Sequence, residues 1–393
     1  MTAIARDTDL VAAARALAPL IESEADAAEL AGTMTVPVVQ ALHEAGLFGL
    51  MIPTALGGSE ASILAVLEVF EELSRADGST GWSHMANATA MSMAAVFTSD
   101  DACAAIFADA ATRMPAIAGM FAPQGSAELG DDGNYVFTGR YGFASGSGHA
   151  AWISGGALVV HKGEFVARAD GMPEMRVAFV PRDQVEFLDN WDVLGLQGTG
   201  SYDYALHDVA VEAGFTFPLL DAVAHRGGPV YGLSVLGITA AGHAGFALGV
   251  GKRGLEEVVR IVAGKARLGA SPVRDQQLFQ YELGLHDAAM RAARAVVFES
   301  FGEVEANLRD GREPGPEKRG RLRQVTTYAT RVAAEAVRFA YTWAGSDALR
   351  QPSVLGRCFR DMHAGTQHLF VDNNTLSDAG ALLLAGPSSA PAD

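Results

Sequence analysis

The chain has 393 residues, of which 49% are apolar and 19% charged, and its formal net charge is −17 at pH 7. A chain of this length can bury a large core, and we expect two or three subdomains. The acidic balance argues against nucleic acid as the main partner, because binding phosphates requires clustered Lys and Arg.

Neither the N-terminal stretch of the chain nor its cysteines indicate a secreted or membrane protein. The N-terminal stretch lacks the basic start and apolar core of a signal peptide, and no aliphatic run looks long enough to span a bilayer. Cys103 and Cys358 lie far apart and lack metal-ligand spacing. A reduced, cytoplasmic compartment is the simplest interpretation, and we expect neither a membrane partner nor a metal site.

The first third of the chain has the apolar periodicity of helices. Residues 9–50 carry two apolar stripes, and residues 63–73 form a further amphipathic segment. Residues 82–96 are rich in Ala and Met and predict a buried helix. The breaks between these helices come at the Pro and Gly residues of 53–58.

The pattern changes near Pro115 and predicts an all-β segment that ends near Phe217. Short alternating apolar runs cover residues 135–138, 152–160, 177–180, 185–188 and 204–211. Within this segment, residues 139–152 (GRYGFASGSGHAAW) predict a β-hairpin with a small polar loop. Its aromatic residues alternate with small ones, which allow a flat ligand to lie close to the backbone, although an ordinary strand and turn fits the same pattern.

Helical periodicity returns in the last part of the chain, over residues 231–263, 275–308 and 317–343, and a last helix starts near Val354. The first of these helices is rich in glycine, which predicts close approach of another helix or of a ligand. The tail at 386–393 (GPSSAPAD) is expected to be disordered. We therefore expect three domains, over residues 1–114, 115–217 and 218–393.

Six stretches, in this order, resemble the acyl-CoA dehydrogenase superfamily, and within it the flavin-dependent monooxygenase branch. They are GGSEAS (57–62), RADGSTGWSH (75–84), FAPQGSAE (121–128), GFASGSGHAAW (142–152), VLGLQGTGSYD (193–203) and RCFRDMHAGTQH (357–368). The resemblance implies an α+β, mainly helical fold, with an N-terminal helical domain, a central β-barrel or β-sandwich and a C-terminal four-helix bundle. It also implies a homotetramer.

The resemblance further assigns residues to a flavin site. The backbone of residues 121–125 is expected along the pyrimidine ring, Phe143 against the isoalloxazine, and Ser145 beside N5 and C4a. Lys265 and Arg267 lie where dehydrogenases of this fold carry a flavin-phosphate motif, here in decayed form, and a solvated helix end fits them equally well. The full set of expected cofactor contacts is Phe121, Ala122, Pro123, Gln124, Gly125, Phe143, Ser145, Lys265 and Arg267.

An acyl-CoA dehydrogenase needs a carboxylate as base, and the two positions where the family carries one lack it here. One position falls at His368, and the other lies within residues 215–255, which contain no Glu. The resembling hydroxylases have a histidine at the position of His368, and the unperturbed pKa of an imidazole is near 6.5. The resemblance implies that His368 deprotonates a phenol or steadies an oxygen, unless it packs in the core. Arg357, Arg360 and Asp361 indicate an ion-paired helix surface or a subunit contact.

The function that the resemblance implies is the oxygenase component of a two-component aromatic hydroxylase. It would combine reduced flavin (FADH2 or FMNH2), supplied by an NAD(P)H:flavin reductase, with O2 to give a C4a-hydroperoxyflavin that hydroxylates a small aromatic or heteroaromatic substrate. The expected catalytic residues are His368 and Ser145, and the expected substrate contacts are Trp82, His84, Met85, Met120 and Phe121. Such side chains are also typical of a core. An acyl-CoA dehydrogenase with an unplaced base and a non-catalytic flavin-binding relative remain as alternatives.

Overall fold

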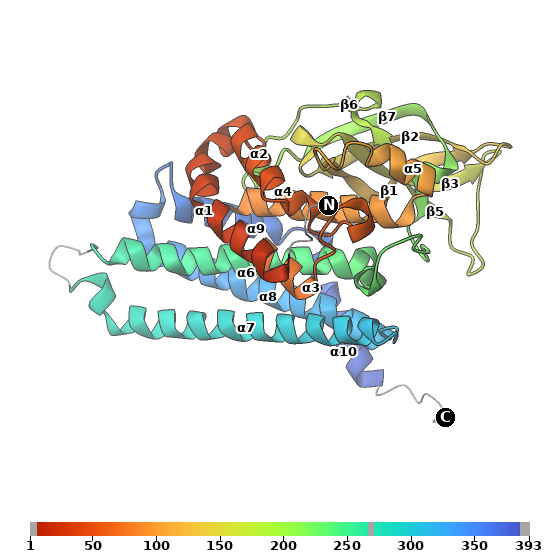
Figure 1. The fold of residues 1–393 in the computed structure, drawn as a ribbon. Coiled ribbons are helices and arrows are strands. Elements are labelled where there is room, and N and C mark those ends of the chain that lie inside the picture. Colours follow the sequence, from red (N-terminus) through yellow and green to blue (C-terminus); the bar gives the residue numbers. More distant parts are fainter. Residues whose placement is uncertain (1–5, 266–270, 386–393) are drawn as a thin grey trace. The chain divides into compact units, whose positions relative to one another are not determined.

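The computed structural model describes residues 6–265 and 271–385 (Figure 1). The chain divides into two compact units, each assembled from separated segments. The first unit consists of Met1–Ala61, Trp82–Val193 and Gln197–Tyr231, and the second of Ser62–Gly81, Leu194–Leu196 and Gly232–Asp393. The predicted disordered tail and Arg267 both lie outside the described residues.

The first unit begins with helices whose ends follow ordinary capping rules. Its helices are α1 (Asp7–Ala31), α2 (Val36–Glu44), all but the first turn of α4 (Gly78–Phe97), and α5 (Asp100–Ile106). α1 ends at Gly32, whose φ of 68° is left-handed and favours glycine. α5 begins after Ser99, whose hydroxyl accepts a hydrogen bond from the Ala102 amide at 3.2 Å.

The first unit also contains a single sheet. Its strands are β1 (Ile117–Leu129), β2 (Tyr135–Ala144), β3 (Trp152–His161), β4 (Glu164–Phe165), β5 (Met175–Pro181), β6 (Glu186–Phe187), β7 (Tyr202–Val211) and β8 (Thr216–Pro218). The order is β6-β7-β2-β1-β3-β5-β8, with β4 paired to β3. β1 and β3 run parallel, while the other paired strands are antiparallel. Four of the five predicted apolar runs lie within strands, and the run 185–188 contains the two-residue strand β6, whereas β1 was not predicted. The predicted hairpin at 139–152 is wrong, because β2 and β3 both pair with β1, which lies between them.

The second unit is helical. Its helices are α3 (Ile63–Ala76), α6 (Ser234–Val262), α7 (Gln277–Arg309), α8 (Pro316–Ala344), α9 (Val354–Gly365) and α10 (Asn374–Ala385). The long helices α6, α7 and α8 lie side by side, with α6 and α7 both contacting α8 (Figure 1). α3 packs on α6 and α7, and α9 packs on α6 and α8. The single last helix expected from the sequence is in fact two helices, and His368 lies between them.

The glycines of α6 allow close helix–helix contact. A Cβ at Gly245 would lie 2.6 Å from the Cβ of Phe70 on α3, and one at Gly249 would lie 2.3 Å from the carbonyl oxygen of Glu71. Both distances are shorter than any real contact, so the backbones of α3 and α6 approach closely only because these positions lack a side chain. At these two positions, the interpretation as helix packing is the one that the structure supports.

The apolar character of α6 corrects one expectation. The segment Pro229–Val262 has a mean hydropathy of 1.6 over its most apolar window and is long enough to cross a bilayer, although no such run was expected. In the structure 78% of this window is buried, as in the core helix of a folded unit.

Candidate functional site

Ser145 follows the last residue of β2 and lies in a buried chain of hydroxyl groups in the first unit. Its Oγ accepts a hydrogen bond from the indole Nε1 of Trp82 at 3.1 Å and lies 2.8 Å from the Oγ of Ser201. Ser201 in turn lies 2.6 Å from the hydroxyl oxygen of Thr199. Since the indole can only donate, the hydroxyl proton of Ser145 must point toward Ser201 or toward a ligand.

The loop after Ser145 is fixed by hydrogen bonds to its backbone and hydroxyl groups. The Gly146 amide donates to the Thr199 carbonyl at 2.9 Å, and the Ser147 hydroxyl donates to the Gly200 carbonyl at 2.8 Å. The guanidinium of Arg182 donates to the Ser147 carbonyl. The loop therefore has one well-defined conformation, which sets the position of Ser145.

Phe143 combines an exposed ring with an unusual backbone. Its φ of 64° is left-handed, its side chain is 63% exposed, and its amide donates to Oδ1 of Asp203 at 3.2 Å. The ring makes an edge-to-face contact with Trp191, with centroids 6.1 Å apart. Non-glycine residues in this conformation cost about 1–3 kcal/mol and cluster at functional sites. The exposed ring offers a flat apolar surface two residues from Ser145.

Trp191 also lines a cavity in the first unit of about 360 Å³. Its wall is mostly polar and contains the end of α1 and the segment before Gln197. The lining residues are Glu29, Leu30, Ala31, Gly32, Asp189, Trp191, Asp192, Val193, Gln197 and Tyr202. Three carboxylates in this wall make it a poor place for the phosphate of a cofactor.

Residues 121–125 lie on β1 where its pairing with β3 is irregular. The register shifts between Met120 and Pro123, and again between Pro123 and Gly125. The Gln124 side chain accepts a hydrogen bond from the Gly142 amide at 3.1 Å, which ties the segment to the residue before Phe143. The backbone here leaves the regular ladder, as is common next to ligand sites.

The predicted substrate contacts are held by other protein groups. Trp82 donates to Ser145, and the His84 Nε2 lies 3.0 Å from the Leu47 carbonyl oxygen. Burial lowers the pKa of His84 to about 4. Met85 is buried. The role of these side chains as substrate contacts stays a prediction.

Two further predicted contacts also have protein partners. Met120 is partly buried, and its amide donates to Tyr204 Oη at 3.0 Å. The Phe121 ring makes edge-to-face contacts with Phe179 and Phe217, with centroids 6.4 and 5.9 Å apart. Phe121 therefore packs within an aromatic cluster, and any role toward a flavin or substrate stays a prediction.

His368 lies in the second unit and caps the short helix Leu369–Val371. Its Nδ1 accepts a hydrogen bond from the Phe370 amide at 3.2 Å, so the proton of the neutral ring is on Nε2. Burial lowers the pKa of His368 from the ordinary value near 6.5 to about 4. At neutral pH this imidazole is a hydrogen-bond donor through Nε2 and a weak base.

His243 packs against His368 and was not predicted. It is a buried residue of α6, and its ring centroid lies 4.2 Å from that of His368. Burial, and to a smaller extent the neighbouring His368, lowers its pKa well below the ordinary value. Its ring is also stacked on Phe370, with centroids 5.8 Å apart. The signal in the sequence was a single ionisable residue within residues 234–251, the first part of α6, which is otherwise mostly small and apolar.

Lys265 has protein partners at the end of α6. Its Nζ lies 2.6 Å from Oδ2 of Asp347 and donates to the Ala344 carbonyl. A contact with a flavin phosphate, which stays a prediction, would require this ion pair to open. Arg267 belongs to the part of the chain that the structure does not describe.

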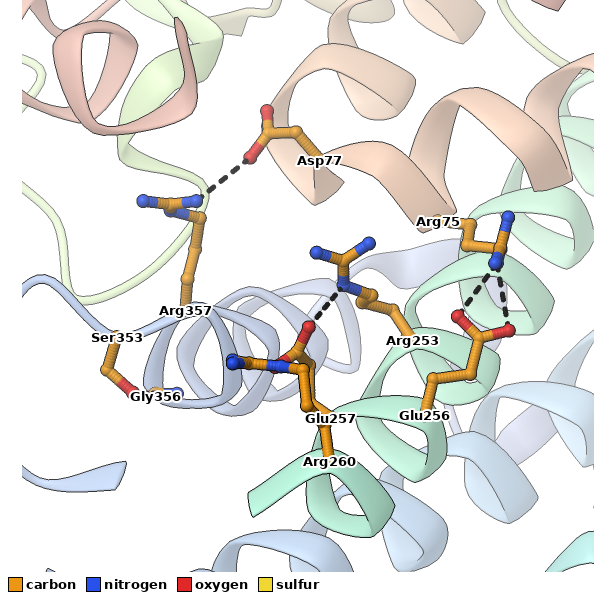
Figure 2. A network of polar contacts seen from close by, with 9 residues as sticks. All are labelled: Arg75, Asp77, Arg253, Glu256, Glu257, Arg260, Ser353, Gly356 and Arg357. Carbon is orange, nitrogen blue, oxygen red and sulfur yellow. Dashed lines mark hydrogen bonds and ion pairs between the residues drawn. The ribbon is translucent and has the colours of Figure 1, made fainter. Parts of the chain in front are cut away.

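Arg357 and Asp361 of α9 are buried, which contradicts an exposed helix surface, one of the two interpretations expected for them. Figure 2 shows Arg357 directed toward Asp77, with Nη1 and Oδ1 4.0 Å apart. The same Asp77 caps α4 by accepting from the Thr80 amide at 2.8 Å. Asp361 accepts from the Leu196 amide at 2.6 Å. These charges join segments of the second unit, which is a structural role.

Two family models match the chain, acyl-CoA dehydrogenase, N-terminal domain, over residues 8–113 and acyl-CoA dehydrogenase, C-terminal domain, over residues 241–373. The crystal structure of the HsaA monooxygenase from M. tuberculosis has a TM-score of 0.86 at 24% identity and covers 99% of both chains. XiaF from Streptomyces sp., solved in complex with FADH2 and glycerol, has a TM-score of 0.86 at 21% identity over 98% of both chains. The fold is therefore acyl-CoA dehydrogenase-like and mainly helical, as expected.

Relatives of known activity show which branch of the acyl-CoA dehydrogenase superfamily the chain belongs to. Indole-3-acetate monooxygenase of Pseudomonas putida is 31% identical over 351 residues, which cover 88% of this chain and 86% of that protein. The flavin-dependent monooxygenase, oxygenase subunit HsaA, of Mycobacterium tuberculosis is 27% identical over 371 residues, or 91% of each chain. The chain thus belongs to the flavin-dependent monooxygenase branch of the acyl-CoA dehydrogenase superfamily. It is an oxidoreductase, and enzymes of this class use reduced flavin and O2.

Proposed function

We propose that this chain is the oxygenase component of a two-component flavin-dependent monooxygenase that hydroxylates a small aromatic or heteroaromatic compound. A separate NAD(P)H:flavin reductase supplies FADH2 or FMNH2. The observation that carries the proposal is the buried Ser145 hydroxyl, which accepts a hydrogen bond from Trp82. Ser145 lies two positions after Phe143, whose ring is exposed and whose backbone is left-handed. From the resemblance alone we also infer a homotetramer, and from the two widely separated cysteines we infer a cytoplasmic location.

The surroundings of Ser145 suit a flat, polar heterocycle. Phe143 offers an exposed ring for stacking, and the irregular backbone of residues 121–125 offers amide and carbonyl groups for the edge of such a ring. We assign Phe143, Ser145 and this backbone to the flavin. When bound, reduced flavin supplies the electrons with which one oxygen atom of O2 enters the substrate and the other leaves as water.

We assign Ser145 to hydrogen-bond with N5 of the reduced flavin. Because the Trp82 indole donates to Oγ, the Ser145 proton is directed away from Trp82 and toward Ser201. The second lone pair of Oγ would then accept a hydrogen bond from N5–H of the reduced flavin. This hydrogen bond is proposed to slow the release of H2O2, so that oxygen reaches the substrate instead.

We assign His368 to donate a hydrogen bond from Nε2 to an oxygen atom during transfer. Its Nδ1 already accepts from the Phe370 amide, and its pKa of about 4 makes it a weak base at neutral pH. Both properties favour steadying an oxygen atom over deprotonating a phenol.

An isotope experiment tests the proposed reaction. The purified protein is incubated with a flavin reductase, NADH, flavin and isotopically labelled O2, together with a panel of indoles and phenols. We expect at least one compound to gain a single labelled oxygen atom by mass spectrometry. A parallel incubation offers an acyl-CoA thioester in place of the aromatic compounds. Oxidation of this thioester without incorporation of label would contradict the proposal and favour a dehydrogenase.

A further inference from the structure

Two tyrosines stack in the core of the sheet beneath the segment at 121–125. Tyr141 of β2 and Tyr204 of β7 lie with ring centroids 4.9 Å apart and planes 13° apart, and both are buried. No part of the function proposed above uses either ring. The two hydroxyl groups differ in their hydrogen bonds, however, and those of Tyr204 involve β1.

The Tyr204 hydroxyl bridges β1 and β3. It accepts a hydrogen bond from the Met120 amide at 3.0 Å and donates one to the Ser154 carbonyl. Burial raises the pKa of Tyr204 well above its ordinary value, so the phenol keeps its proton and remains a donor at any working pH. A side chain thus joins two parallel strands within their own ladder.

This bridge lies where the register of the two strands breaks. Met120 pairs with Gly155, but the next β1 residue in the ladder is Pro123, opposite Gly156. A Cβ at Gly156 would lie only 2.1 Å from the Phe121 carbonyl oxygen, so the extra residues of β1 press against the β3 backbone. The bridge therefore marks the point from which residues 121–125 leave the regular ladder.

We propose that Tyr204 is a positioning residue that sets the backbone of residues 121–125 for the flavin, an inference that rests on the function proposed above. The reason is geometric: the hydroxyl fixes the Met120 amide relative to the Ser154 carbonyl, and Phe121 follows directly. Without the hydroxyl, the Met120 amide and the Ser154 carbonyl each lose one hydrogen bond, and the irregular segment loses its fixed starting point. The flavin would then meet a mobile backbone and lose affinity.

Tyr141 provides a matched control. It has the same ring in the same stack, but its buried hydroxyl makes no hydrogen bond within the described residues. Tyr141→Phe therefore removes the same atom as Tyr204→Phe without removing a hydrogen bond. Both variants keep the aromatic stack, so we expect both to fold.

The test has one readout without flavin and one with it. In the protein alone, hydrogen exchange of peptides covering residues 117–129 is expected to accelerate in Tyr204→Phe and to stay unchanged in Tyr141→Phe. In a fluorescence titration, Tyr204→Phe is expected to weaken flavin binding about tenfold, as the loss of one buried hydrogen bond implies. Incorporation of para-aminophenylalanine at position 204 restores a polar group on the ring and is expected to recover both readouts.

Each outcome decides between defined alternatives. Unchanged exchange and flavin affinity in Tyr204→Phe, with normal binding by the unaltered protein, would overturn the role of Tyr204 and leave the proposed function standing. Equal effects in both variants would also overturn it, because they would reflect the stack and not the bridge. Failure of the unaltered protein to bind flavin would instead overturn the proposed function, and the inference with it.

Discussion

At the scale of single residues, neighbouring groups determine which hydrogen bonds each candidate side chain can still make. Trp82 donates to Ser145 and so leaves the Ser145 proton for another acceptor. The Phe370 amide occupies Nδ1 of His368 and so leaves the proton on Nε2. Ser145 therefore keeps an acceptor lone pair for a ligand, and His368 keeps a donor at Nε2.

The resemblance identified Ser145 and His368 as candidate catalytic residues, but it did not predict which residues contact them. Trp82 is 63 positions from Ser145, and His243 is far from His368 in the sequence, so each pairing depends on the tertiary fold. The pKa of His368 depends in the same way on burial by distant residues, which no local pattern indicates.

The lowered pKa of His368 predicts a pH-dependent stability. As pH falls below 6.5 the unfolded chain binds a proton at this residue, while the folded chain stays neutral until about pH 4. The free energy of unfolding should therefore decrease over this window, by at most about 3 kcal/mol from this group. His243 faces the same ring, and its lowered pKa adds a loss of the same sign.

The variant His368→Asn isolates this contribution, because Asn can still cap the Phe370 amide but does not titrate. Denaturant unfolding between pH 7 and pH 4 should show a shallower loss of stability than in the unaltered protein. His225→Gln, at an exposed position, serves as the control and should keep the original slope. An unchanged slope in His368→Asn would contradict the lowered pKa.

At the scale of elements, the long periodic helices and the alternating strands were predictable, and the exceptions have physical causes. β1 was missed because Gly119, Pro123 and Gly125 interrupt its pattern and its register with β3 shifts twice. The boundary between α9 and α10 was missed because His368 supplies a cap from a position that looks helical. The close contact of α3 with α6 was predicted only as one of two alternatives, since the glycines of α6 indicated close approach either of another helix or of a ligand.

That contact predicts a sharp difference between two glycines. Gly249→Ala would place a methyl group 2.3 Å from the Glu71 carbonyl oxygen, so the helices must separate, at a cost of about 1–3 kcal/mol. Gly284→Ala on α7 meets nothing within 4 Å and should stabilise by up to about 1 kcal/mol. Thermal unfolding of both variants provides the measurement. Equal effects would contradict the packing of α3 on α6.

At the scale of the whole molecule, the chain divides into two units, and the two candidate catalytic side chains belong to different units. Ser145 belongs to the unit that holds the sheet, and His368 belongs to the helical unit. The division does not follow the three segments expected from the sequence, because Ser62–Gly81 is grouped with the C-terminal helices. Those three domain boundaries stay a prediction.

As a flavin-dependent monooxygenase, this chain is predicted to control how reduced flavin reacts with O2. The purified protein with bound reduced flavin is mixed rapidly with oxygenated buffer, and absorbance and H2O2 are followed. We predict a long-lived species whose spectrum differs from both reduced and oxidised flavin. In Ser145→Ala this species should decay faster, with more H2O2 and little hydroxylated product.

Ser23→Ala is the matched control, because it removes the same atom from an exposed serine of α1, whose hydroxyl donates to the Leu20 carbonyl and has no assigned role toward flavin. It should retain the lifetime seen in the unaltered protein. The contradicting result is oxidation of flavin at the rate of free flavin, with full release of H2O2, in the unaltered protein and in Ser145→Ala alike, whether or not an aromatic substrate is present.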